Sequence, residues 1–182
     1  MLSTVNTREM KLFFLITSLF CFSILATAQK GNNLVGISLD LGIPLGDFED
    51  FAQVGIGGTV RGLYGVGTAG HITLTTGYSY FRWKDLIPGE DANSHIIPVL
   101  IGYRHNFPPF FVEPYIGYAS YGEKYSYLNN TSSASIGSFA WGGGLGWSRG
   151  GFEGGVRFLG LTKEGTLPTV FVYIGYDLPL GK

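Results

Sequence analysis

The segment from Gly146 to Gly150 reads GWSRG and matches G-x-S-x-G, the pattern that positions a serine nucleophile in many hydrolases. That arrangement needs a helix after the serine, and an acid and a histidine further along the chain. Ser148 is instead followed by Arg-Gly-Gly and another alternating segment, and the last histidine is His105. The sequence therefore predicts no nucleophilic catalysis at Ser148.

A second glycine pattern, GVGTAG from Gly65 to Gly70, matches the dinucleotide-binding pattern G-x-G-x-x-G. A dinucleotide site requires a helix N-terminus directly after the glycines, because its amides bind the pyrophosphate. The next residues are HITLTTGYSYF, which alternate and are rich in β-branched side chains. We therefore expect these glycines to form a hairpin turn and bind no cofactor.

Metal binding is not predicted either. The three histidines, His71, His95 and His105, are scattered, and the only cysteine is Cys21. No two of them have the spacing of metal ligands. The net charge of the chain is −1, which provides no basic surface for nucleic acid. Catalytic, cofactor and metal sites are all expected to be absent.

The N-terminal region has the composition of an export signal. Arg8 and Lys11 precede an apolar run from Leu12 to Leu25, and Ala26-Thr27-Ala28 forms an A-x-A cleavage site. The run is too short to span a bilayer comfortably. We expect a signal peptide at 1–28, cleaved after Ala28, and one domain at 29–182, with the true start at either Met1 or Met10. Since Cys21 lies in the signal, the mature domain would contain no disulfide.

The elements after the signal alternate with period two, and no segment from residue 34 onward shows a helical period. Each is about ten residues long, the length of a tilted transmembrane strand. Eight such segments are expected, at 34–44, 54–64, 71–81, 96–105, 111–122, 137–148, 152–161 and 169–178.

The two faces of these strands differ in size rather than in charge. In the first, Val35, Ile37 and Leu39 alternate with Gly36 and Ser38. A barrel in water would carry charged groups on its second face. A face of glycine, serine and threonine suits the narrow interior of an eight-stranded barrel, with the bulky face toward lipid. The sequence predicts an all-β fold: an eight-stranded antiparallel up-and-down transmembrane β-barrel.

The charged residues within the strands fall on the small-residue face. A charge facing the bilayer midplane costs about 2–4 kcal/mol, whereas charges inside the barrel can pair. We expect a structural polar network in the barrel interior, with Asp40 and Asp177 near strand ends. Its predicted members are Arg61, Arg104, Glu113, Glu153 and Arg157.

Connections and aromatic residues fit the same picture. The connections after strands one, three, five and seven are expected to be long, and those after strands two, four and six short, as in barrels whose short turns face the periplasm. Phe139 and Trp147 are spaced to lie at the two rims of an apolar belt. Further candidates for the aromatic girdles are Tyr78, Tyr80, Tyr103, Phe152, Phe158 and Tyr176.

Five segments also suggest a family: ISLDLGIPLGDFEDF, VGIGGTVRGLY, ITLTTGYSYFRW, IIPVLIGYRHNF and FVEPYIGYASYG. In this order they resemble small outer-membrane β-barrel proteins of Bacteroidota, within the eight-stranded outer-membrane protein A and X class. The resemblance covers the mature chain and implies the cell outer membrane, contact with its lipid and lipopolysaccharide, and insertion by the outer-membrane assembly machinery. One departure is the C-terminus, YDLPLGK, which lacks the terminal aromatic residue common in such barrels.

Three functions remain open. The first is a non-enzymatic structural or surface-interaction barrel that binds a surface ligand through long extracellular loops at 82–95 and 123–136. The second is an enzyme that modifies lipid A, for which His95, Ser94 and Glu90 or Asp91 form the local candidate group. The third is a narrow small-solute channel, against which the predicted interior network argues.

Overall fold

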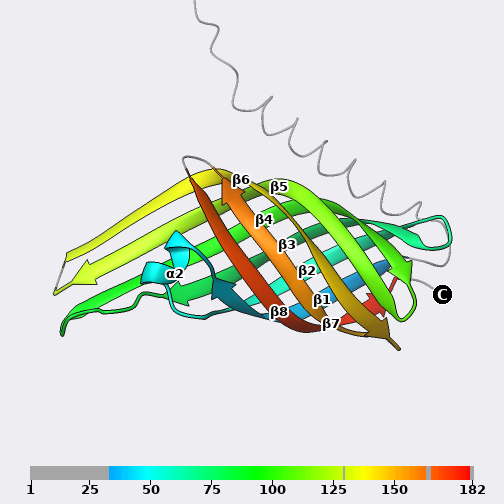
Figure 1. Ribbon diagram of the computed structural model, residues 1–182, viewed down its shortest axis with the longest axis horizontal. Coiled ribbons are helices and arrows are strands. Elements are labelled where there is room, and N and C mark those ends of the chain that lie inside the picture. Colours follow the sequence, from blue (N-terminus) through cyan, green and yellow to red (C-terminus); the bar gives the residue numbers. More distant parts are fainter. Residues whose placement is uncertain (1–32, 129, 163–164, 181–182) are drawn as a thin grey trace, which may run out of the picture.

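The computed structural model describes residues 33–128, 130–162 and 165–180, so the predicted signal peptide and its cleavage site lie outside the described residues. Eight antiparallel strands form a closed barrel in which each strand pairs with the next and β8 pairs with β1 (Figure 1). The predicted fold is confirmed. The strands are β1 (Leu34–Pro44), β2 (Gly55–Val66), β3 (Gly70–Arg82), β4 (Glu90–Phe107), β5 (Phe110–Tyr127), β6 (Asn130–Arg149), β7 (Phe152–Thr162) and β8 (Thr166–Pro179).

The outer face of the barrel is apolar. In β1, Leu39 is 70% exposed, whereas its neighbours Ser38 and Asp40 are buried. Other strands repeat this pattern: Leu74 of β3 and Ile174 of β8 are 62% and 69% exposed. In water, such a continuous apolar surface would be unfavourable. The predicted orientation, with bulky apolar side chains outward, is the observed one.

The interior differs from the predicted lining of small residues. Several large side chains point inward and are buried, among them Phe81, Tyr115, Leu159 and Phe171. Glycines opposite them provide the space: a Cβ at Gly42 would lie 2.8 Å from Phe81 and 2.9 Å from Phe171. Large side chains therefore fill the lumen, and glycines on other strands leave the space that these side chains occupy.

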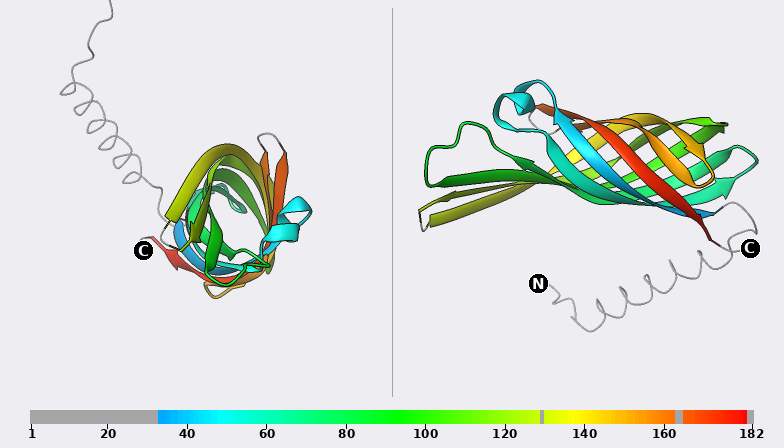
Figure 2. Two further views of the ribbon diagram at one scale, coloured as in Figure 1. Left: turned by 90° about the vertical axis from the view of Figure 1, so that its left-hand side faces the viewer. Right: turned by 90° about the horizontal axis from the view of Figure 1, so that it is seen from below.

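Strands β4, β5 and β6 extend furthest beyond their predicted bounds, and β8 also begins earlier than predicted, which changes the connections. β4 begins at Glu90, and β5 and β6 remain paired as far as Tyr127 and Asn130. The segment 123–136 is therefore a paired hairpin rather than a long loop, and the connection between β7 and β8 is also short. The outer parts of β4, β5 and β6 project beyond the rest of the barrel (Figures 1 and 2).

The long connection after β1 contains a short helix, α2 (Asp47–Phe51), which period analysis did not predict. Its Phe48 is fully buried and contacts Phe81 and Tyr121 edge-on, with ring centroids 5.1 and 6.0 Å apart. A helix this short has no repeating period, so a single buried aromatic residue fixes its position. No helix among the described residues has the length and apolar character needed to cross a membrane.

Candidate functional site

A group of ionic side chains occupies the lumen near the short turns that follow β2, β4 and β6. Arg61 of β2 and Arg104 of β4 each contact Glu153 of β7 at 2.9 Å. Arg104 also donates from Nε to Glu113 of β5 at 3.0 Å and approaches Asp177 of β8 at 3.3 Å. These five residues form the charge cluster, which connects strands that are not neighbours in the sheet.

Arg104 is the centre of the charge cluster. It is 2% exposed, and its guanidinium lies 3.8 Å from the centroid of the Phe111 ring. Glu113 receives a further hydrogen bond from the Thr73 hydroxyl at 2.9 Å. Because burial of a charge is costly unless it is paired, these contacts offset the desolvation of each ion.

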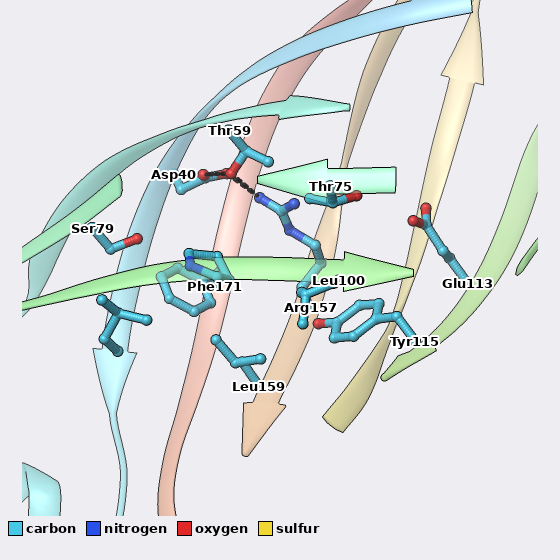
Figure 3. Close-up of a pocket in the computed structure, with 12 residues that line it drawn as sticks. Asp40, Thr59, Thr75, Ser79, Leu100, Glu113, Tyr115, Arg157, Leu159 and Phe171 are labelled. Atoms are coloured by element: carbon cyan, nitrogen blue, oxygen red, sulfur yellow. Dashed lines mark hydrogen bonds and ion pairs between the residues drawn. The ribbon is translucent and has the colours of Figure 1, made fainter. Parts of the chain in front are cut away.

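A second ionic group lies in the middle of the lumen. Arg157 of β7 crosses to Asp40 of β1, and it also donates to the Thr59 hydroxyl at 3.2 Å. Thr59 in turn donates to Asp40. The guanidinium of Arg157 lies 4.4 Å from the centroid of the Tyr173 ring. Figure 3 shows this arrangement from the cavity beside it.

The cavity beside Arg157 is small. Its volume is about 30 Å³, and its lining includes Asp40, Tyr115 and Phe171. A space of that size holds one or two water molecules. The middle of the lumen is therefore occupied by side chains rather than by an open path.

The structure places all five predicted network residues inside the barrel, each no more than 8% exposed. It brings Arg61, Arg104, Glu113 and Glu153 together in the charge cluster, with Arg157 in the second group. Asp40 and Asp177, which the sequence placed near strand ends, are members of these groups as well. Their partners could not be read from the sequence, because they belong to strands that meet only across the lumen.

The residues considered for catalysis are not arranged for it. Ser94 points into the barrel and is fully buried, where its Oγ accepts a hydrogen bond from Trp83 and lies 3.2 Å from the Tyr121 hydroxyl oxygen. His95 is the next residue of the same strand, so its side chain points to the opposite face, and it stacks on Tyr78. A catalytic serine and its base must lie within hydrogen-bond reach, whereas Ser94 and His95 lie on opposite faces of β4.

The two glycine patterns form strand ends and turns. Gly67 has a φ of 74° in the turn between β2 and β3. Ser148 lies at the end of β6, where its backbone N–H donates to the Pro109 carbonyl. No group of metal-binding side chains was found in the described part of the chain.

The projecting part of the barrel, which we call the ribbon, comprises 90–95 of β4, 121–127 of β5 and 130–138 of β6. β7 pairs with β6 only from Phe139 onward, so the outer edge of β6 from Asn130 to Ser138 has no partner strand among the residues that the structure describes. This edge is a row of backbone donors and acceptors available for pairing.

The ribbon was not predicted, because the segments 82–95 and 123–136 were expected to be loops. One face of it carries Tyr121, Glu123, Tyr125 and Tyr127, which occupy alternate positions of β5. Glu90 of β4 is paired with Tyr127 and lies on the same face. The period-two placement of these residues was a signal for a strand, but it lacks the apolar alternation of a membrane-facing segment.

No protein-family model matches the sequence, and no curated protein does either. Solved structures are similar. Ail, the attachment invasion locus protein of Yersinia pestis, has 14% identity and a TM-score of 0.60, covering 80% of this chain and 97% of Ail. The N-terminal β-barrel domain of Pseudomonas aeruginosa OprF has 14% identity and a TM-score of 0.58, covering 82% of this chain and 100% of that domain.

A major outer membrane protein from Thermus thermophilus is also similar, at 9% identity and a TM-score of 0.56, covering 81% of this chain and 100% of that protein. The identities of these proteins to this chain are too low to carry over a function. The likeness shows the fold: this chain has the small up-and-down β-barrel architecture of outer-membrane proteins such as Ail and the OprF barrel domain.

Proposed function

We propose that this chain is a non-enzymatic integral protein of the cell outer membrane, in which a closed barrel holds the ribbon outside the cell as a binding surface. The membrane location is supported by the apolar outer face, on which Leu39, Leu74 and Ile174 are each more than 60% exposed. Hydrocarbon is the solvent in which such a face is stable. Lipid and lipopolysaccharide would contact this face, and the assembly machinery would insert the barrel.

The orientation follows from the connections. The turns after β2, β4 and β6 are all short, which is typical of the periplasmic end of outer-membrane barrels, whereas both long connections, after β1 and β3, lie at the opposite end. The opposite end carries α2 and the ribbon, so both would face outward. The charge cluster lies near the periplasmic end and closes the lumen there.

The open edge of β6 is the single observation that carries the binding role. Proteins usually protect an edge strand with proline, charge or a covering segment. The sequence from Asn130 to Ser138, NTSSASIGS, contains no proline and no charged residue. An edge left in this form can accept an extended segment of a partner through main-chain hydrogen bonds.

The solved neighbours agree with a surface role without defining the ligand. Ail is named as an attachment invasion protein, and one of its structures contains the heparin analogue sucrose octasulfate. The outer end of this chain favours a different ligand charge, because its described residues include seven acidic and three basic ones. The acidic residues are Asp47, Glu49, Asp50, Asp85, Glu90, Asp91 and Glu123, and the basic ones are Arg82, Lys84 and Lys124.

The two alternatives have less support. A small-solute channel would need a path through the charge cluster and past the cavity of about 30 Å³ beside Arg157. An enzyme acting on lipid A would need Ser94 and His95 on one face of β4, and they lie on opposite faces.

The binding role is tested with a ribbon-shortened variant. Residues 123–134 are removed, and Gly122 and Ser135, which are paired in the native hairpin, are joined through an Asn-Gly turn. Bacteria that display either form are compared for retention on surfaces coated with extracellular proteins. We expect retention for the full chain and its loss for the variant. Equal retention of the two would refute the binding role.

The closed lumen is tested separately in planar bilayers. We expect no steady conductance for the full chain, because the buried ionic groups and large side chains fill the barrel. A steady open pore in the unmodified protein would favour the channel instead.

A further inference from the structure

The inner face of the ribbon has a chemical character that the open edge does not explain. Tyr121, Glu123, Tyr125 and Tyr127 follow one another on this face of β5, and Glu90 lies beside Tyr127. The opposite face carries Lys124 and Asp91 instead. Both charged residues of the inner face are therefore negative, whereas the opposite face carries one charge of each sign.

Two of the three tyrosine rings on this face are available for contact. Tyr125 and Tyr127 are 39% and 41% exposed. The Tyr125 hydroxyl donates to Glu90 at 2.5 Å, and this hydrogen bond raises the pKa of Tyr125, so the ring stays neutral. The Tyr121 hydroxyl donates to Glu123 at 2.8 Å. The Tyr125 ring is therefore held by Glu90 with its face accessible, and Tyr127 is accessible beside it, whereas Tyr121 is buried against Phe48 and supports the strand.

Neutral tyrosine rings beside carboxylates match cationic side chains. A lysine or arginine over a tyrosine ring gains a modest cation–π interaction at an exposed site. A carboxylate within reach adds an ion pair of similar size. An anionic or purely apolar ligand would gain neither.

The spacing indicates the form of the ligand. Tyr125 and Tyr127 are two residues apart on one strand, which is about 6.6 Å. An extended peptide places alternate side chains at the same interval. Basic residues at every second position would therefore meet successive tyrosines, with Glu90 and Glu123 beside them.

We propose that the inner face of the ribbon, with Glu90, Glu123, Tyr125 and Tyr127, binds an extended polypeptide segment with lysine or arginine at alternate positions. This inference names the partner class for the proposed binding role and rests on that role. It uses side chains rather than the backbone edge of β6, so the two can be tested apart.

The test measures binding of a labelled peptide of about ten residues with alternating lysine and threonine. The full barrel is placed in nanodiscs of zwitterionic lipid, with empty nanodiscs as the blank, and binding is followed by fluorescence anisotropy. We expect saturable binding that weakens as salt is raised, since exposed charges are screened. A peptide with glutamate in place of lysine should not bind.

Substitutions on the two faces of the ribbon test whether the peptide binds the inner face. Glu90→Gln with Glu123→Gln should weaken binding about tenfold, because it removes both carboxylate charges while keeping their hydrogen-bond acceptors. Tyr127→Leu should weaken it about threefold, by loss of the cation–π contact. Asp91→Asn is the matched control: it removes one negative charge at the residue after Glu90, on the opposite face, and should change binding less than twofold.

Equal weakening by Asp91→Asn and Glu90→Gln, or no saturable binding of the lysine peptide, would overturn the inference. The surface-retention experiment separates this outcome from failure of the binding role itself. If the ribbon-shortened variant loses retention while the Glu90→Gln, Glu123→Gln variant keeps it, the ribbon binds a partner but not through this face. If neither variant loses retention, the binding role fails as well.

Discussion

At the scale of single residues, the interior is held by contacts that cross the lumen. Arg104 joins strands β4, β5, β7 and β8 through Glu113, Glu153 and Asp177. The sequence placed these charges on the inner face by their alternation with apolar residues. It could not pair them, because the register across a closed barrel depends on how every strand is staggered.

Arg104→Met tests the importance of this residue. Removal of one partner of a buried ion pair costs about 3–5 kcal/mol, because the remaining charges stay buried without compensation. We expect a loss of that size in the free energy of unfolding, measured by urea titration in lipid vesicles. Arg149→Gln is the control, since Arg149 is the exposed last residue of β6 and should change stability by less than about 0.5 kcal/mol. Similar effects of the two substitutions would contradict the role of the cluster.

Glycine at position 142 is required for close approach of strands. A Cβ there would lie 1.9 Å from the Phe158 carbonyl oxygen, so the backbone would have to move. We expect Gly142→Ala to destabilise the barrel by about 1–3 kcal/mol. At Gly62 the nearest atom is 4.0 Å away, so Gly62→Ala should be tolerated. The same urea titration compares them, and equal stability of the two variants would show that the strands adjust freely at Gly142.

At the scale of elements, the membrane-facing parts of the strands were predictable and the ribbon was not. Residues such as Leu39 and Leu74 alternate with small or polar ones because one face meets hydrocarbon and the other meets the lumen. From Asn130 to Ser135 neither face is buried, so the segment lacks apolar alternation. Its pairing with β5 is visible only in the structure. α2 was missed for the related reason that one buried residue, Phe48, makes no period.

The ribbon should be dispensable for folding. Its residues from Lys124 to Ser135 are mostly exposed and contact mainly one another. We expect the ribbon-shortened variant, which lacks 123–134, to lose less than about 1 kcal/mol of unfolding free energy. Phe48→Ala, at a fully buried site on the same side of the barrel, should cost about 3–5 kcal/mol. A ribbon-shortened barrel that fails to fold would show that the hairpin is part of the barrel's stability rather than an appendage.

At the scale of the whole molecule, the distribution of polar and apolar side chains is inverted. The barrel has apolar side chains outside and ionic groups such as Arg157 with Asp40 inside, which inverts the usual distribution in a protein surrounded by water. This inversion was predictable from the sequence, because glycine, serine and threonine replace charged residues on the second face. The size of the side chains that fill the lumen was not, because the space left by each glycine depends on its neighbours across the barrel.

The most direct test of this inversion is the environment of Leu74. Cys21, the only cysteine, lies in the predicted signal peptide, so one cysteine can be introduced at Leu74 and labelled with a fluorophore. We predict strong quenching by lipids with brominated acyl chains and little by aqueous iodide, with the reverse at Ser126→Cys on the ribbon. Quenching of the Leu74 label by iodide but not by brominated lipid would contradict the account.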